Sequence, residues 1–179
     1  KAKRKVIAFK GGYHGDTFGA MSVSGRGIFT NPFERFLFEV IHIDPPIGDF
    51  KNKASKEIQR LVRKGDVACF IFEPLVMGAG GMLMYEPRTL DEMISVCRKN
   101  NILTIADEVM TGFGRTGKLF ASEYLKNQPD IICLSKGLTG GFLPMGLTVC
   151  TKEIYQAFYS EDMTKTFFHG HSYTANPLS

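Results

Sequence analysis

The chain has 179 residues, of which 44% are apolar, which is enough for one domain with a core and excludes a disordered protein. Its net charge is +4, with acids and bases interspersed, and the basic cluster at residues 1–5 is interpreted as a solvated approach to a strand, with a nucleic-acid patch as the alternative. No apolar run reaches the roughly 18–20 residues that cross a bilayer, and no signal peptide is recognised.

The predicted elements alternate between strand-like apolar runs and helical patterns. In chain order they are strands at 6–9 and 36–43, a helix at 53–63, a strand at 67–72, a helix at 88–100, strands at 102–106, 131–134 and 147–150, and a helix at 153–159. Continuously apolar runs such as 67–72 are typical of strands buried on both faces. The alternation predicts an α/β domain with a mostly parallel sheet and helices on both faces.

The four cysteines lack the close spacing of a zinc site or a redox pair. Three of them lie in apolar runs that we interpret as buried strands, so we expect reduced thiols in a cytoplasmic protein. The four positions are Cys69, Cys97, Cys133 and Cys150. Because the chain begins without Met and stops just after Asn-Pro-Leu, we expect it to be a piece of a longer protein.

Glycine-rich stretches follow three of the predicted strands, at residues 78–81, 112–117 and 137–141. Ligands of open α/β sheets bind beyond the carboxyl ends of the strands. We therefore expect these three stretches to converge on one edge of the sheet.

Residues 112–117, Gly-Phe-Gly-Arg-Thr-Gly, match the dinucleotide-binding fingerprint, and Asp130 follows 18 residues after the first glycine (130 − 112). Asp107 and Glu108 at the strand end would repel a pyrophosphate, however, and little room remains for a crossover helix. A P-loop fails at Leu119, where the motif requires a hydroxyl for Mg²⁺. We interpret the stretch as an active-site loop.

Two residues at strand ends have the chemistry of a pyridoxal-phosphate site. Asp107 follows the strand at 102–106; it could cap a helix, but Val-Met-Thr-Gly-Phe-Gly is a poor helix start. A carboxylate there can keep a pyridine nitrogen protonated. Lys136 follows the strand at 131–134, where burial of a lysine is costly unless it has a partner or a reaction. Its amine can attack an aldehyde, although a surface lysine with a buried stem is the alternative.

Residues 13–15, Tyr-His-Gly, follow the first predicted strand. Tyr13 can stack on a flat heterocycle, whereas the simpler interpretation is a turn with an exposed Tyr and a structural His14. His169 and His171 are only two residues apart and have no nearby Cys or carboxylate, so we expect no metal site.

Residues 13–17, 106–117 and 135–137 resemble the class III aminotransferases, which are fold type I pyridoxal-phosphate enzymes. The resemblance spans nearly the whole chain, and its motifs stand in the expected order. Residues 13–23, 77–82 and 167–177 are most similar to the branch of the class that serves biotin synthesis. Asp16, after Tyr-His-Gly, has the greatest weight for this branch.

The resemblance implies roles for several residues of the cofactor site. Lys136 would hold pyridoxal 5'-phosphate as a Schiff base, and Asp107 would pair with its ring nitrogen. Val109 would pack on one face of the ring and Tyr13 on the other. His14 belongs to the same implied cofactor-binding set.

Further implied roles concern the substrate and a second subunit. Tyr13, Asp16 and Gly170 would border the substrate. His171 and Ser172 would reach the cofactor phosphate of the neighbouring subunit, so the family's active site is shared within a homodimer. Glu73 resembles the strand-end acid of many class members.

Residues 1–179 would then be the central part of the cofactor-binding large domain, without the N-terminal phosphate loop and the C-terminal small domain with its substrate-binding Arg. The implied reaction converts 8-amino-7-oxononanoate to 7,8-diaminononanoate with S-adenosylmethionine as amino donor. Alternatives are a class III enzyme of the 4-aminobutyrate or ornithine type, an aminomutase and a non-catalytic binding module. No nucleic-acid or membrane partner is expected.

Overall fold

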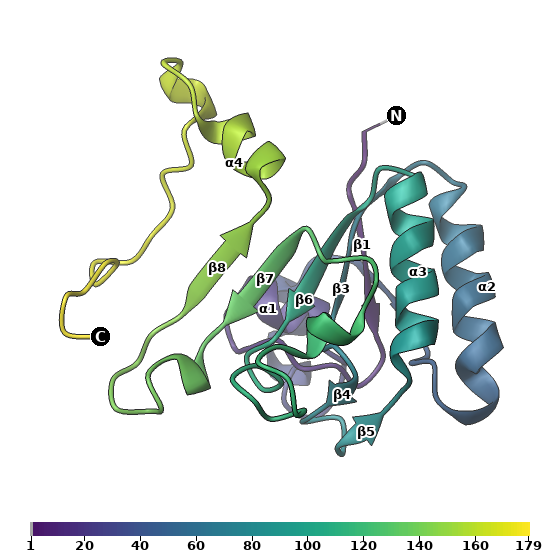
Figure 1. Cartoon of the computed structure of the whole chain (residues 1–179). Helices are drawn as coiled ribbons and strands as arrows, with labels where there is room; N and C mark the ends of the chain where they lie inside the picture. The colour runs from purple at the N-terminus through teal and green to yellow at the C-terminus, as the bar shows by residue number, and fades with distance from the viewer. Residues whose placement is uncertain (1) are drawn as a thin grey trace.

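The computed structural model describes residues 2–179, and its centre is a six-stranded sheet in the order β2-β1-β3-β6-β7-β8 (Figure 1). All neighbouring strands are parallel except β7 and β8, which are antiparallel. The strand bounds are β1 Lys5–Phe9, β2 Val40–Ile43, β3 Val67–Phe72, β6 Leu103–Asp107, β7 Ile131–Leu134 and β8 Leu147–Cys150. A separate antiparallel pair is formed by β4 (Val76–Met77) and β5 (Leu83–Met84).

Helices α2 (Lys51–Val62) and α3 (Pro87–Lys99) lie side by side on one face of the sheet, and α1 (Phe18–Val23) lies on the other (Figure 1). Helix α4 (Lys152–Phe158) follows β8 and stands away from these layers. Short 3-10 helices occupy Asn31–Phe36, Gly48–Phe50, Ala121–Tyr124, Lys136–Leu138 and Met163–Lys165. The predicted α/β class, with helices on both faces of a mostly parallel sheet, is confirmed.

The alternation of side chains along β1 and β3 explains why both faces of the sheet are covered. Ile7, Phe9, Phe70 and Phe72 point toward α2 and α3 and are at most 1% exposed. The intervening residues Ala8 and Ile71 pack with Val23 of α1 on the opposite face. A strand that is buried on both faces reads as a continuous apolar run, which is why β3 was predicted with correct bounds.

The two long helices form because their apolar residues recur on one face. In α2 the buried residues are Ala54, Ile58, Leu61 and Val62, which are the four that the sequence pattern indicates. Helix α3 begins with Pro87, whose missing N–H costs nothing at a first helical position. Its buried residues include the predicted Leu90, Met93, Ile94 and Cys97.

Two expectations about strands were wrong in part. The strand predicted at 36–43 begins only at Val40, because Asn31–Phe36 forms a 3-10 helix with proline in its first turn. Strand β8 has the predicted bounds, but all four of its residues are exposed. It is the last strand of the sheet order, and Cys150 is therefore exposed, where burial was expected. All four cysteines are free thiols.

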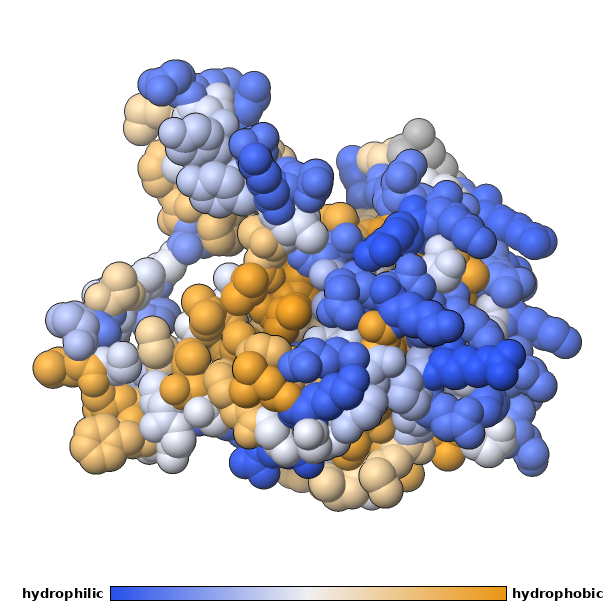
Figure 2. Space-filling model, in the orientation of Figure 1, coloured by the Kyte–Doolittle hydropathy of each residue, from blue (hydrophilic) through white to orange (hydrophobic). Residues whose placement is uncertain are grey.

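The two sides of the molecule differ in surface character. The outer surface of α2 and α3 is hydrophilic, whereas apolar side chains gather over the β7–β8 side (Figure 2). Leu147 and Val149 of β8 are 43% and 44% exposed, and Phe142 in the β7–β8 connection is 89% exposed. Among the helices of residues 2–179, none has the length and apolar character needed to span a membrane.

Candidate active site

The sheet brings four polar strand ends together at its carboxyl edge. The chain runs outward from β1 to β2, then returns to β3 and proceeds through β6 to β7, so the order reverses between β1 and β3. Such a reversal is where open α/β sheets bind ligands. Tyr13 and His14 follow β1, Glu73 follows β3, Asp107 ends β6, and Lys136 follows β7 with one residue between.

Five of the residues predicted to bind the cofactor line a single cavity of about 470 Å³. That volume lies within the roughly 300–1,000 Å³ of small-molecule sites. The five are Tyr13, His14, Asp107, Val109 and Lys136. Asp107 and Lys136 thus border one cavity from neighbouring strands, as the sequence predicts.

The Asp107 carboxylate is held by hydrogen bonds at both oxygens. His14 Nδ1 donates to Oδ2 over 2.7 Å, and the Val109 N–H donates to Oδ1 over 3.1 Å. The side chains of His14 and Asp107 are only 3% and 9% exposed. Nε2 of His14 is buried and has no hydrogen-bond partner within residues 2–179. Within residues 2–179, the only side-chain hydrogen bond of His14 is therefore the one to Asp107. Because both of its oxygens accept a hydrogen bond, the Asp107 carboxylate has a fixed orientation at the cavity wall.

Glu73 joins two walls of the cavity. Its Oε1 accepts a hydrogen bond from the Tyr13 N–H over 3.0 Å, and its Oε2 accepts one from the Gly78 N–H over 2.9 Å. Burial raises the pKa of Glu73, and the charge of Asp107 adds to the effect, while the two N–H groups and His14 oppose it. The strand-end acid therefore fixes the loop that carries Tyr13 against the glycine-rich stretch at 78–81.

Lys136 differs from expectation in its burial. The side chain is exposed, and its amine makes no hydrogen bond or ion pair within the described residues. The cost of burying a lysine therefore gives no reason for a lysine at this position. Its backbone has φ +40°, a left-handed conformation that costs a lysine about 1–3 kcal/mol and is concentrated at functional sites. Gly137 follows because a Cβ there would lie 2.7 Å from Phe113.

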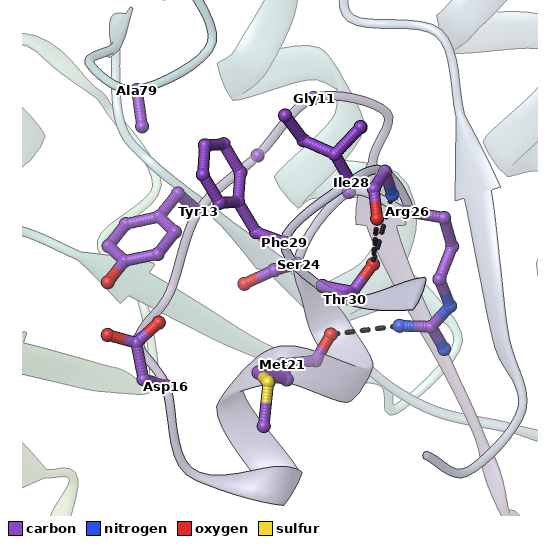
Figure 3. A pocket seen from close by; sticks show the side chains of 14 residues that line it. Gly11, Tyr13, Asp16, Met21, Ser24, Arg26, Ile28, Phe29, Thr30 and Ala79 are labelled. Carbon is purple, nitrogen blue, oxygen red and sulfur yellow. Dashed lines mark hydrogen bonds between the residues drawn. The ribbon is translucent and has the colours of Figure 1, made fainter. Parts of the chain in front are cut away.

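A second cavity of about 530 Å³ adjoins the first and shares Tyr13, Gly15 and Ala79 with it (Figure 3). Asp16 lines this second cavity, and its carboxylate lies beside the Tyr13 hydroxyl. Partial burial raises the pKa of Tyr13, and the hydrogen bond and charge of Asp16 raise it further. Tyr13 therefore stands between the two cavities, and Asp16 belongs to the second one.

The site residues that were predicted near the end of the chain line neither of these two cavities. Gly170, His171 and Ser172 are exposed and follow the 3-10 helix Met163–Lys165. His171 lines another cavity, of about 750 Å³, together with Ser135 and Met145. Its predicted contact with a neighbouring subunit's cofactor stays a prediction, as does the approach of Gly170 to the substrate.

Only one of the three glycine-rich stretches contributes to the central cavity. Gly78 and Ala79 line it, whereas the stretches at 112–117 and 137–141 do not. The three stretches nevertheless converge on one edge of the sheet, as predicted, because they follow the carboxyl ends of β3, β6 and β7, which are parallel neighbours. Strands β6 and β7 are connected through the 3-10 helix Ala121–Tyr124, which agrees with the rejection of a dinucleotide fold.

Sequence reasoning missed the role of Glu108. Its side chain is fully buried and accepts hydrogen bonds from Thr111, Ala121 and Ser122. The available signal was the pair of consecutive acids at a strand end, since successive side chains of a strand point to opposite sides. Asp107 faces the cavity, and Glu108 faces the protein interior.

The comparisons with known proteins agree with this architecture. The aminotransferase class-III family matches residues 1–179. The adenosylmethionine-8-amino-7-oxononanoate aminotransferase of Synechococcus elongatus is 51% identical, with 98% of this chain and 43% of the relative covered. The enzyme of the same name from Staphylococcus aureus is 43% identical, with 98% and 42% covered.

Solved structures give the same result. The crystal structure of adenosylmethionine-8-amino-7-oxononanoate aminotransferase from Methanocaldococcus jannaschii matches with a TM-score of 0.87 and 42% identity, covering 97% of this chain and 40% of that one. An (S)-enantioselective omega-transaminase from Thermomicrobium roseum matches at 0.86 and 34% identity, covering 94% and 40%. The chain thus spans less than half the length of these relatives. It belongs to the class III aminotransferases.

Proposed function

We propose that this chain forms the cofactor-binding core of an aminotransferase that converts 8-amino-7-oxononanoate to 7,8-diaminononanoate in biotin synthesis, with S-adenosylmethionine as amino donor. The observation that carries the proposal is the meeting of Asp107 and Lys136 at one cavity, at the ends of the neighbouring strands β6 and β7. The choice of reaction rests on the relatives, whose names give the acceptor and point to adenosylmethionine.

The residues at the cavity fit pyridoxal 5'-phosphate. The Asp107 carboxylate is oriented by two donors and borders the cavity, so it offers an anion to a protonated ring nitrogen. The Lys136 amine has no competing partner among the described residues and is available to an aldehyde. Val109 supplies an apolar side chain and Tyr13 an aromatic ring at the same cavity.

When bound, pyridoxal phosphate supplies an aldehyde that condenses with amines and a ring that withdraws electrons from the reacting carbon. Asp107 holds a proton at the ring nitrogen, and His14 keeps the carboxylate in position. Lys136 would hold the aldehyde, and its amine would move a proton to and from the substrate carbon as general base and acid. Tyr13 and Asp16 border the adjoining cavity, where the rest of the substrate binds.

The complete site also needs groups that do not line this cavity. Residues 1–179 act as the central part of the large domain, and the phosphate loop and the small domain are supplied by flanking segments. Gly170 approaches the substrate, and His171 and Ser172 reach the cofactor phosphate of the neighbouring subunit in a cytoplasmic homodimer. The exposure of this segment, away from its own chain's cavity, supports a role across a subunit interface.

Replacement of Lys136 tests the reaction. Full-length protein with Lys136→Ala should lose the visible absorbance of the bound cofactor, and turnover should fall by roughly 10²–10⁴-fold or more. Lys126→Ala is the matched control, because Lys126 is also exposed but lies before β7 and outside the cavity. Retained turnover in Lys136→Ala would refute the assignment.

A donor screen separates the proposed reaction from its rival. The likeness to an omega-transaminase favours, as a second candidate, an enzyme of the 4-aminobutyrate or ornithine type. Amino transfer from S-adenosylmethionine to 8-amino-7-oxononanoate is the expected result. Strong activity with 4-aminobutyrate and none with 8-amino-7-oxononanoate would favour the rival. An aminomutase would need no separate keto substrate, and a binding module would show no turnover.

A further inference from the structure

We propose that Glu108 is a positioning residue, whose buried carboxylate holds the turn that orients Asp107 at the cavity. This inference rests on the proposed function, since it assigns to Glu108 an effect on how the protein holds the cofactor ring. Glu108 itself does not line the cavity, so its effect passes through the backbone of its neighbours.

The burial of Glu108 requires an explanation. Its side chain is 0% exposed, and a buried carboxylate is costly unless it is hydrogen-bonded or paired. Within residues 2–179 it has no cationic partner. Instead it accepts three hydrogen bonds, from Thr111 Oγ1 over 2.6 Å, from the Ala121 N–H over 3.0 Å and from the Ser122 N–H over 2.7 Å. The charge is therefore offset by oriented dipoles from two segments of the chain.

The backbone of Glu108 makes two more connections. Its N–H donates to the Cys133 carbonyl of β7 over 2.9 Å, and its carbonyl accepts from the Gly112 N–H over 2.8 Å. A Cβ at position 112 would lie 2.8 Å from that carbonyl oxygen, so the turn closes this tightly only on glycine. Glu108 thus fastens β7, the turn at 111–112 and the start of Ala121–Tyr124 to the end of β6.

The turn that Glu108 closes contains Val109, and Val109 connects it to the cofactor site. The Val109 N–H donates one of the two hydrogen bonds that orient the Asp107 carboxylate, and its side chain lines the cavity. If the turn loosened and the Val109 N–H moved away, the Asp107 carboxylate would keep only its hydrogen bond from His14. We therefore expect weaker cofactor binding and a changed pH dependence of the bound cofactor's absorbance.

Three substitutions in the full-length protein test this inference. Glu108→Gln keeps the shape but replaces one acceptor oxygen with a donor that faces N–H groups. Thr111→Val removes one hydrogen bond at a fully buried position. Glu123→Gln is the matched control, because Glu123 lies on the same connection and accepts a hydrogen bond from the Phe120 N–H over 2.9 Å, but is exposed.

The measurements are the dissociation constant of pyridoxal phosphate from the apoprotein, the pH dependence of the visible absorbance, and the unfolding midpoint of the apoprotein. Glu108→Gln should raise the dissociation constant by roughly 10–100-fold, as for other residues that orient a ligating group, and should shift the pH profile. Thr111→Val should change both in the same direction by less. Glu123→Gln should match the wild type.

A lowered unfolding midpoint with an unchanged dissociation constant and pH profile would overturn the inference, since Glu108 would then be only structural. If Glu108→Gln does not fold, Thr111→Val decides by the same criteria. A wild-type protein that takes up no cofactor would overturn the proposed function and this inference with it. Normal uptake by the wild type and unchanged uptake by the Glu108 and Thr111 variants would overturn this inference alone.

Discussion

Residues 5–134 and residues 147–179 both contain regular secondary structure but differ in what covers it. In the first region β1, β3 and β6 are covered by α2 and α3 on one face, and α1 lies on the other. In the second region, which the structure describes completely, no residue is buried although β8 and α4 are well-formed elements. A sequence pattern therefore predicts an element without saying whether its own chain buries it.

Thiol labelling should show the largest difference between the two regions. Cys97 in α3 is fully buried, and burial raises the pKa of its thiol to about 12. At pH 8 only about one Cys97 thiol in 10⁴ would be ionised. Cys150 in β8 is exposed. In the 179-residue chain by itself, we expect a disulfide reagent to label Cys150 roughly 10³-fold faster than Cys97, as read by mass spectrometry of peptides.

Equal labelling rates for the two cysteines would contradict the packing described for the first region. Slow labelling of both in the full-length protein would instead show that β8 is covered by parts outside this chain, as expected for a homodimer. Cys150→Ser is the control that assigns the fast phase.

Truncation of apolar side chains should show the next largest difference. Ile94 of α3 is 0% exposed, and Val149 of β8 is 44% exposed. Ile94→Ala should lower the free energy of unfolding by about 2–5 kcal/mol, because it removes buried methyl groups and leaves a cavity. Val149→Ala should cost less than about 1 kcal/mol.

Urea unfolding of the chain followed by circular dichroism measures both changes. Similar losses in the two variants would mean that β8 contributes to the same core as α3. A small loss for Ile94→Ala would mean that the α3 interface is poorly packed.

The pH dependence of stability should show the smallest effect and concerns the cavity within the first region. Because burial raises the pKa of Glu73 above its ordinary 4.5, its contribution to stability is complete below that value and is lost as pH rises through the folded-state pKa. Glu73→Gln cannot ionise, so its free energy of unfolding should fall less than that of the wild type between about pH 4.5 and 7. Parallel pH profiles of the two proteins would contradict the raised pKa.

The first region was predictable because its own chain supplies the packing partners. The bounds of β3 and the buried face of α2 follow from apolar spacing alone, and Asp107 and Lys136 were found because polar residues at the ends of buried strands require a reason. The exposure of β8 and Lys136 was not predictable, because burial depends on which surfaces meet. Glu108 and Glu73 were missed or left without a role because their partners are mostly backbone N–H groups, which leave no trace in the residue pattern.

Peptide mapping after borohydride treatment of the full-length protein identifies the lysine that holds the cofactor, which we propose is Lys136 opposite Asp107. Borohydride fixes the cofactor to the amine that holds it, and trypsin does not cleave at a modified lysine. We expect a single labelled peptide covering residues 127–152, with the added mass on Lys136. Label on another lysine, or no label on a protein that has bound the cofactor, would contradict it.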